Sequence, residues 1–353
     1  MRAGTLARVH GDPVSLGGHF SQRVDFVARQ RNDVIITDPL TSLARWTAPT
    51  WSIAGGVVSN TPTLSADILA DGNMEAVGVG SWAAYGTPAT REKSAAQAHG
   101  GSQSLHILTD ADYEGAGQAP VTVSGAWYIY DGWLYRAVAD KSTRIILQDW
   151  RGWAYAASAI DANISTWLYR SCASRATGTG SFFEIICLHT GADVYIDDLT
   201  AKRVTLATAF ATRRTRLQNF NAIFPPFTHS GLYEHSVPVG IVVCLDDPGD
   251  PKNFIIAYHN GGSALRIEKC VDGVYTALSS TSVTYGATKY LSVKKNGDSV
   301  SVYYATTDYG ALVATVTVSD AAIQAGRYLG LFSMSPQHSF NPASVPFQVR
   351  LYA

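Results

Sequence analysis

One stretch near the end of the chain alternates polar and apolar residues on both sides of an Asn-Gly pair. It runs from Lys289 to Tyr304 and reads KYLSVKKNGDSVSVYY. Alternation with a period of two is the pattern of a half-buried strand, and Asn-Gly favours the tight turn that joins two antiparallel strands. The stretch therefore predicts a β-hairpin.

Short runs of the same kind dominate the rest of the sequence. They are rich in β-branched and aromatic residues, and turn residues separate them at a spacing of about 8 to 12 residues. Examples are GIVVCLDD, NFIIAYHN, ALRIEKCV and ATVTVSD. Only 91–98 and 319–324 have a helical composition, and neither carries a sustained apolar stripe. We predict an all-β chain built of antiparallel β-sandwich domains.

The composition excludes several classes of partner. Of the 353 residues 46% are hydrophobic, which is enough for ordinary cores, while 16% are charged and the formal net charge is -1. Such a chain has no basic field to hold a nucleic-acid backbone or an anionic membrane. No apolar run reaches the roughly 18 residues of a membrane span, and the start lacks the apolar core of a signal peptide. We therefore expect no nucleic acid, no membrane and no export signal.

The four cysteines lie inside apolar, strand-like runs and have no metal-ligand spacing. They are Cys172, Cys187, Cys244 and Cys270. We expect them to be small buried hydrophobic residues. A bridge between Cys172 and Cys187 stays open, because the sequence does not place their Cα atoms within bonding distance.

Two changes of composition divide the chain. SNTPT at 59–63 closes one apparent strand, DDLTAKR at 197–203 closes another, and the sequence between them is rich in tryptophan and tyrosine. From about 64 to 203 the chain resembles the jelly-roll carbohydrate-binding modules that are attached to glycanases and found in phage and bacterial surface proteins. The matching pieces include ADGNMEA, VSGAWYIYDGWLYRAVA, STWLYRSCA and ADVYIDDLTAKRV.

The resemblance implies a structural calcium ion. In that family an acid of the first strand and an acid of the last strand hold the ion together with carbonyls of a loop. The matching residues are Glu75 and Asp197, and the loop is 99–102, which includes Gly101. Calcium takes six to eight hard oxygen ligands, which two carboxylates and a glycine-rich loop can supply. The alternative is that Glu75 bonds to backbone amides or to a basic side chain without a metal.

The large rings of 127–136 point to both sides of their strand. By alternation, Tyr128 and Tyr130 face one way, whereas Trp127, Trp133 and Tyr135 face the other. Both faces cannot be core, so one exposes flat rings, and such rings beside polar groups can stack on the apolar side of a sugar. The alternative is that they pack against a neighbouring domain or subunit. The candidate carbohydrate-binding residues are Trp133, Tyr135, Trp150, Trp153 and Arg144, with Asp149 as a polar neighbour.

The two flanking segments resemble the parts of one further sandwich. Residues 38–63 look like the opening strands of a concanavalin A-like or laminin-G-like domain, and residues 204–353 look like the remainder. The economical arrangement inserts the module of 64–203 into a loop of this second sandwich, since insertion is tolerated where the ends of a loop lie close together. Residues 1–37 match neither sandwich, and we expect an extended N-terminal arm that folds on a partner.

Catalytic motifs are missing from the sequence. Glucanases with a concanavalin A-like fold carry their acids as E-x-D-x-E or a close variant on one strand, and no glutamate here has that setting. HExxH, GxSxG and a phosphate-binding glycine loop are also absent. We expect a non-catalytic protein; the rival is a polysaccharide-degrading enzyme, or its binding module, whose acids follow no familiar pattern.

Nested glycan-type sandwiches without a catalytic set resemble the virion surface proteins of tailed phages, such as tail, fibre and capsid decoration proteins. The resemblance implies a virion location after synthesis in the host cytoplasm, and adhesion to a cell-surface glycan. It also implies contacts with other virion proteins through the N-terminal arm, and a homo-oligomer. A purely structural decoration subunit that binds no sugar is the second rival.

Overall fold

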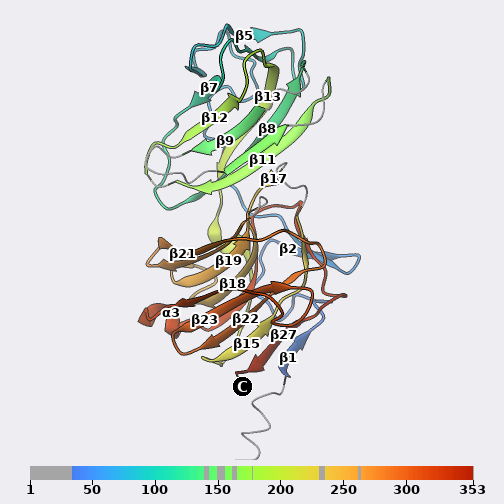
Figure 1. Ribbon diagram of the computed structural model, residues 1–353, viewed down its shortest axis with the longest axis vertical. Coiled ribbons are helices and arrows are strands. Elements are labelled where there is room, and N and C mark those ends of the chain that lie inside the picture. The colour runs from blue at the N-terminus through green and yellow to red at the C-terminus, as the bar shows by residue number, and fades with distance from the viewer. Residues whose placement is uncertain are drawn as a thin grey trace, which may run out of the picture.

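The computed structural model describes residues 34–138, 143–148, 156–160, 165–176, 178–229, 235–260 and 264–352. Within these ranges the chain is all-β with antiparallel sandwich packing, as predicted. Figure 1 shows two bodies stacked along the long axis, which we call the upper body and the lower body. Most of the predicted N-terminal arm, residues 1–33, lies outside the described ranges.

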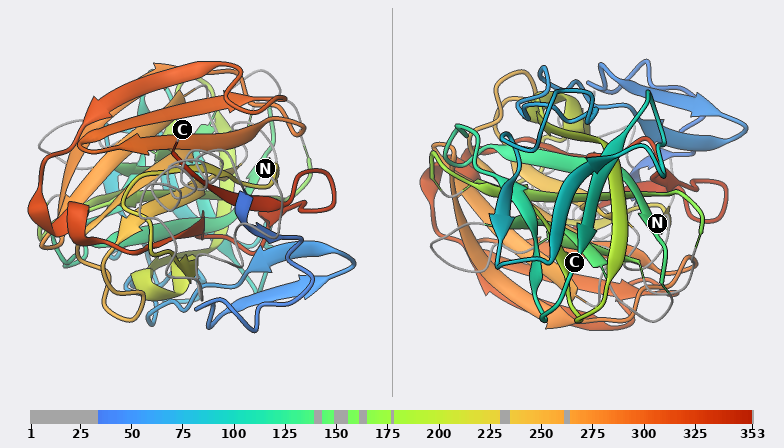
Figure 2. Two further views of the ribbon diagram at one scale, coloured as in Figure 1. Left: turned by 90° about the horizontal axis from the view of Figure 1, so that it is seen from below. Right: turned by 90° about the horizontal axis from the view of Figure 1, so that it is seen from above.

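The described residues of the lower body form three sheets. Sheet A has the order β1 (Val34–Asp38), β27 (Phe347–Leu351), β15 (Phe220–Ile223), β22 (Tyr290–Asn296), β23 (Ser299–Ala305), β24 (Leu312–Thr317). Sheet B has the order β14 (Phe210–Arg214), β25 (Tyr328–Ser333), β18 (Val239–Leu245), β19 (Phe254–His259), β20 (Ala264–Val271), β21 (Val274–Ser282). Sheet C has the order β16 (Phe227–Thr228), β26 (Ser339–Phe340), β3 (Val57–Asn60), β2 (Trp51–Ala54), and its β2–β3 hairpin projects from the side of the body (Figure 2).

In the upper body, two sheets are formed by the residues that the structure describes. Sheet D has the order β10 (Ala156–Ile160), β9 (Thr143–Gln148), β12 (Phe182–Cys187), β7 (Glu114–Gln118), β4 (Ala83–Tyr85). Sheet E has the order β17 (His235–Ser236), β11 (Leu168–Arg175), β8 (Trp127–Arg136), β13 (Asp193–Arg203), β6 (Ser104–Leu108), β5 (Thr90–Ser94). Within sheet E, β17 pairs in parallel with β11. In the chain it follows β16 of the lower body.

Each body has its own apolar core, and the alternation of the strands explains both. Sheets D and E enclose residues such as Trp82, Tyr130 and Phe183. Sheets A and B enclose residues such as Ile241 and Val293. The 289–304 hairpin forms as predicted, with Asn296 of β22 opposite Ser299 of β23 and Gly297 at a φ of 55° in the turn.

The structure corrects one sequence expectation and settles another. Of the two segments with helical composition, 91–98 supplies part of strand β5, whereas 319–324 overlaps the short helix α3 (Ala321–Ala325). A second helical turn, the 3-10 helix η1, spans Leu206–Ala209. β5 pairs with β6 along its whole length, so sheet pairing overrides the helical composition. All four cysteines are buried and free, which leaves no Cys172–Cys187 bridge.

Apart from β17, the chain enters the upper body and leaves it through two adjacent segments. Leu64 forms an antiparallel bridge with Val204, and the Thr205 amide donates to the Thr63 carbonyl at 2.9 Å. The segment between these crossings contains β4–β13, all of which lie in the upper body. The nested arrangement of 64–203 within 38–63 and 204–353 stays a prediction, and these contacts are what supports it.

Sheet E packs on sheet B, so that the two bodies share a third apolar cluster. Trp127, Ile129 and Ala173 from the outer face of sheet E meet Phe254, Tyr258 and Phe332 and other residues from the outer face of sheet B. Strand β18 is buried along all seven residues because the lower-body core covers one side and this cluster the other. Sheets D, E, B and A therefore follow one another as layers.

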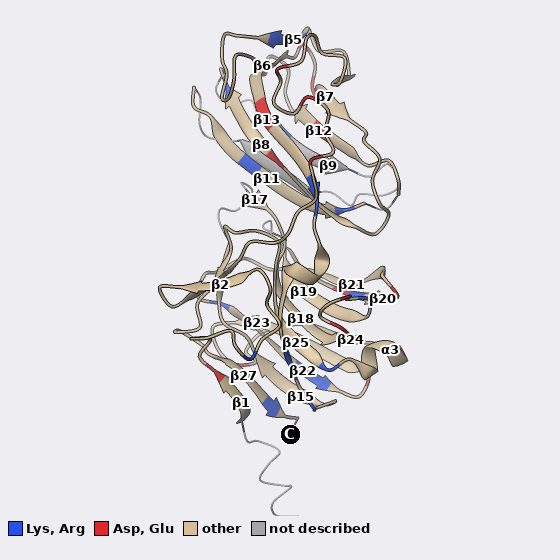
Figure 3. Cartoon of the chain, turned by 180° about the vertical axis from the view of Figure 1, so that it is seen from behind, with Lys and Arg blue, Asp and Glu red and all other residues tan. Residues whose placement is uncertain are grey.

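Charged residues are interspersed over the described parts of both bodies, as Figure 3 shows. Among the described residues no helix has the length and apolar character that a bilayer crossing needs.

The packing of sheet E on sheet B makes a prediction about two tryptophans of one strand. Trp127 is 5% exposed between the sheets, whereas Trp133 lies on the same face of β8 beyond the contact. We expect Trp127→Ala to lower the free energy of unfolding by about 3–5 kcal/mol, because it leaves a cavity between the bodies. Trp133→Ala, as the matched control, is expected to cost about 1 kcal/mol. Urea denaturation followed by circular dichroism measures both, and equal losses would contradict the layered packing.

Candidate functional site

The outer face of sheet E is covered at one end and open at the other. Along β8, the lower body covers Trp127 and Ile129, while Asp131, Trp133 and Tyr135 on the same face are only partly buried. The intervening residues point inward to the core. The sequence pattern predicted this division of β8 into two faces, and the structure confirms it.

Neighbouring strands add rings to the open part. Tyr169 of β11 is directly opposite Trp133, and Tyr195 of β13 is directly opposite Tyr135. Trp167 precedes β11 and lies against the same rings. We call these five partly buried side chains, Trp133, Tyr135, Trp167, Tyr169 and Tyr195, the aromatic face.

The rings of the aromatic face contact one another at fixed angles. The centroids of Trp133 and Tyr169 are 5.5 Å apart, and those of Tyr135 and Tyr195 are 5.9 Å apart. Tyr135 and Trp167 are 5.6 Å apart. Such contacts hold flat side chains in place without a ligand, so little rotamer entropy is left to lose on binding.

Two histidines border the aromatic face and are held by carboxylates. His99 stacks on Trp133 at 4.0 Å between centroids, and its Nδ1 lies 2.8 Å from an oxygen of Asp198. His106 stacks on Tyr195 at 4.4 Å, and its Nε2 lies 2.9 Å from an oxygen of Asp193. Flat apolar rings therefore lie beside polar groups.

The structure divides the predicted carbohydrate-binding residues. Trp133 and Tyr135 lie together on the aromatic face. Arg144 does not join them, because it lies on β9 in sheet D, the other sheet of the sandwich. Trp150 and Trp153, with Asp149, lie outside the described residues. Alternation within STWLYR and DVYID could have indicated Trp167, Tyr169 and Tyr195; nothing local in the sequence indicated His99 or His106.

The predicted metal residues do meet at one loop. The Asp197 Oδ2 accepts hydrogen bonds from the amides of His99 and Gly100 at 2.9 and 3.0 Å. The Glu75 Oε1 accepts from the amides of Ser102 and Gln103 at 2.8 and 3.1 Å. Gly101, at a φ of 63°, makes the turn between the two sets of donors. The loop is therefore held at both ends by carboxylates.

The two carboxyl groups of this clasp differ in environment. Bonds from the hydroxyl and amide of Ser102 lower the pKa of Glu75, which lies at the surface. Burial raises the pKa of Asp197, although three backbone amides oppose that shift. Between them, the two carboxylates accept hydrogen bonds from N–H and O–H groups. A calcium ion needs oxygen ligands, so these contacts do not by themselves fit calcium. Calcium at Glu75, Asp197 and Gly101 stays a prediction; calorimetry after chelator treatment tests it, and no heat with calcium would remove it.

A lysine supplies a buried positive charge beside the clasp. The Lys93 ammonium of β5 pairs with the Asp71 carboxylate and donates to the Met74 carbonyl at 2.7 Å. Both side chains of the ion pair are at most 6% exposed. Lys93 therefore ties the segment that carries Glu75 to the edge strand of sheet E.

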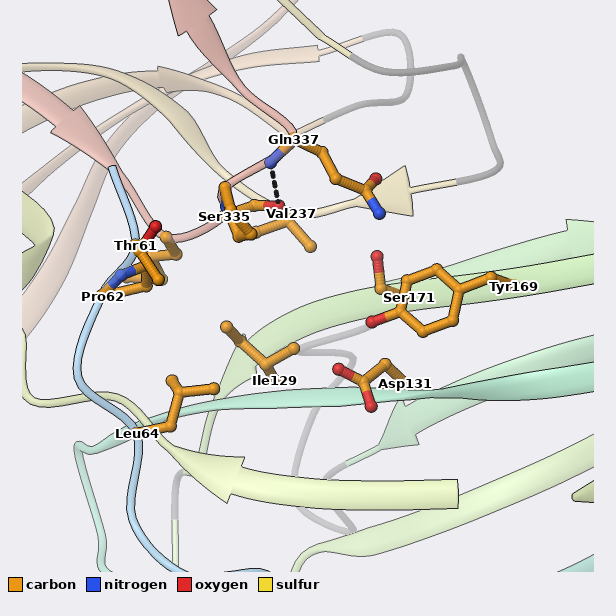
Figure 4. A pocket seen from close by; sticks show the side chains of 12 residues that line it. Thr61, Pro62, Leu64, Ile129, Asp131, Tyr169, Ser171, Val237, Ser335 and Gln337 are labelled. Carbon is orange, nitrogen blue, oxygen red and sulfur yellow. Dashed lines mark hydrogen bonds between the residues drawn. The ribbon is translucent and has the colours of Figure 1, made fainter. Parts of the chain in front are cut away.

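A cleft lies where the aromatic face meets the lower body (Figure 4). Its volume is about 200 Å³, and β8 and β11 form one wall. Asp131 stands in this wall; its Oδ1 accepts from the Thr200 hydroxyl at 2.6 Å, and its carboxylate is also bonded by the Tyr169 hydroxyl. Burial raises the pKa of the Asp131 carboxyl despite these donors.

Sheet D contains two buried glutamates that do not form a pair. Glu114 lies opposite Cys187, whose side chain is in the upper-body core. Glu184 is three residues before Cys187 on β12 and therefore faces the other side of the sheet. Because the two carboxyl groups are on opposite faces, they do not present the facing pair that glycosidases use.

No protein-family model and no curated protein matches the chain. Several solved structures do match parts of the chain. TmCBM61 in complex with beta-1,4-galactotriose is 16% identical, covers 39% of this chain and 99% of its own, and has a TM-score of 0.33. The CBM22-1 xylan-binding domain from Paenibacillus barcinonensis Xyn10C is 16% identical over 41% of this chain and 96% of its own, with a TM-score of 0.32. The enzymatically active domain of bacteriophage CBA120 tailspike protein 4 is 11% identical over 39% of this chain and 21% of its own, with a TM-score of 0.32. At 11–16% identity and TM-scores of 0.32–0.33, these likenesses carry no conclusion about function.

The Lys93 pair makes a prediction about stability. Lys93→Met is expected to lower the free energy of unfolding by about 3 kcal/mol, because it leaves the Asp71 carboxylate buried without its partner. Lys252 pairs with Asp250 at 2.7 Å, but both side chains are more than half exposed. Lys252→Met, the control, is expected to cost less than about 1 kcal/mol. Urea denaturation compares the two, and a similar small loss in both variants would show that the Lys93 pair is not a buried tie.

Glu184 makes a prediction about pH. It is 6% exposed, its Oε2 accepts no hydrogen bond within the described part of the chain, and burial raises its pKa from 4.5 to about 7. Between these values the folded state binds more protons than the unfolded state, so its contribution to stability is lost as the pH rises from about 4.5 to about 7.

Glu184→Gln is therefore expected to remove up to about 3 kcal/mol of the fall in unfolding free energy between pH 4 and pH 8. Chemical denaturation at several pH values measures this fall. Asp272→Asn, which removes a carboxyl group at an exposed turn, serves as the matched control. An unaltered slope in Glu184→Gln would mean that this carboxyl titrates normally.

Proposed function

We propose that this chain is a non-catalytic glycan-binding protein whose aromatic face binds a neutral sugar chain. The observation that carries the proposal is the set of fixed, partly exposed rings on one open half of sheet E. A sugar ring presents an apolar C–H side to such rings and hydroxyl groups to the polar residues beside them. The imidazoles and carboxylates at the border supply these polar partners.

The absence of catalysis is part of the proposal. The described glutamates of sheet D lie on opposite faces, and the carboxylates beside the aromatic face are bound to histidines, to backbone amides or, in Asp131, to hydroxyl groups. The rival, a polysaccharide-degrading enzyme, predicts release of reducing ends from a polysaccharide in proportion to the amount of protein. Such release would overturn the proposal that the protein is non-catalytic. It would not contradict the proposal that the aromatic face binds glycan.

We further propose that the protein acts at the surface of a tailed-phage virion, as a tail, fibre or capsid decoration protein that adheres to host glycans. This setting rests on the resemblance of the nested sandwiches to such proteins, which is an analogy of fold. It includes a homo-oligomer and attachment to other virion proteins through the N-terminal arm. Antibody labelling of purified particles tests the location, and a purely structural decoration subunit would label particles yet bind no glycan.

The aromatic face makes a prediction about affinity. The probes are hexasaccharides of β-1,4-linked galactose, glucose, xylose and mannose, measured by isothermal titration calorimetry. For whichever hexasaccharide binds, we expect Trp133→Ala to weaken binding about tenfold or more, because the largest central ring is lost. Tyr303→Ala is the control, since Tyr303 is a partly buried ring on β23 of the lower body. Equal affinities of the Trp133→Ala variant and the unmodified protein would place the binding site elsewhere.

A further inference from the structure

We propose that the cleft between the two bodies is a terminal subsite that takes the end ring of a neutral glycan chain lying on the aromatic face. This inference rests on the proposed function and adds a specificity to it: the protein binds the ends of glycan chains rather than their interiors. It follows from where the cleft lies, how it is closed and which groups line it.

The cleft is continuous with the aromatic face. Asp131, Trp133 and Tyr135 follow one another on the same side of β8, and alternate residues of a strand are about 6.6 Å apart. Tyr169 belongs to both places, because its ring contacts Trp133 and its hydroxyl bonds to Asp131 in the cleft wall. A chain of sugar rings that lies along β8 over the aromatic face therefore reaches the cleft.

The far side of the cleft is closed. The next outward residues of β8 are Ile129 and Trp127, both buried against the lower body. The Trp127 indole donates to the Tyr275 hydroxyl of the lower body at 3.1 Å. A glycan cannot continue along the strand past this contact, so the ring that enters the cleft is the last of its chain.

The cleft is lined by both apolar and polar side chains, and a sugar ring needs contacts of both kinds. Leu64, Ile129 and Val237 provide an apolar side. Asp131, Ser171 and Gln337 bring a carboxylate, a hydroxyl and an amide from both bodies, and Figure 4 shows the Gln337 amide and the Ser171 hydroxyl extending toward the same space. The carboxylate favours a ring with neutral hydroxyl donors over an anionic ring.

The size of the cleft limits what it can hold. Its volume of about 200 Å³ is below the roughly 300–1,000 Å³ of sites that enclose drug-sized ligands. A single ring is the matching size, whereas a continuing chain needs a second opening.

The test counts binding sites on a polysaccharide. The probe is the long β-1,4-linked polysaccharide whose hexasaccharide binds, before and after partial acid hydrolysis, titrated into the full-length protein by calorimetry. We expect the number of sites per gram to rise in proportion to the number of chain ends. If the number of binding sites per gram of polysaccharide is already high before hydrolysis and does not rise after it, the terminal subsite is overturned. In that case, loss of binding in the Trp133→Ala variant would still support the proposed function.

A variant tests the cleft itself. Gln337 is exposed at the cleft rim, so Gln337→Ala is expected to fold normally and to weaken hexasaccharide binding about fivefold through the loss of one hydrogen bond. Thr306→Ala, at an exposed loop of the lower body, is the matched control and should bind as the unmodified protein does. Unchanged affinity in Gln337→Ala overturns the subsite, whereas failure of every hexasaccharide to bind any form of the protein overturns the proposed function.

Discussion

The contact between sheet E and sheet B determines which parts of this molecule are available for binding. Within this contact, the Trp127 indole donates to the Tyr275 hydroxyl, and the Arg175 guanidinium lies 4.0 Å from the centroid of the Tyr275 ring. Arg175 also pairs with Glu268 of sheet B at 3.4 Å. Removal of the Trp127 side chain is expected to cost about 3–5 kcal/mol, compared with about 2 kcal/mol for a desolvated cation–π contact.

This contact has a consequence for the aromatic rings beyond it. Because the lower body covers one end of the outer face of sheet E, the open rings form a platform with one closed end. The same cover creates the cleft, whose lining comes from both bodies. A module with the same sheet but without the lower body would present an open face and no cleft, so end recognition is a property of the assembly of the two bodies.

The sequence predicted local features well because each depends on a short pattern. The hairpin between β22 and β23 follows from alternation and an Asn-Gly turn, and the two faces of β8 follow from alternation alone. The meeting of Glu75 and Asp197 at the loop followed from a family resemblance, and the structure shows the donors that hold the loop.

Other features depend on contacts between segments far apart in the sequence. Arg144 is close to the aromatic residues in sequence, but β9 pairs with β12 in the opposite sheet, which no local pattern reveals. Residues 91–94 have a helical composition yet form an edge strand because β6 offers hydrogen-bond partners. Which half of sheet E is covered depends on β18 and β19, more than a hundred residues away from β8.

In the proposed complex the sugar lies on the open half of sheet E and not on the half that the lower body covers. The indole N–H signals of Trp133 and Trp127, assigned through Trp→Phe variants, report on the two halves separately in a nuclear magnetic resonance titration with the hexasaccharide. We expect the Trp133 signal to move with ligand concentration, and the Trp127 signal to stay in place because its N–H is bonded to Tyr275. A titration in which the hexasaccharide binds but the Trp133 signal does not move would contradict this placement of the sugar.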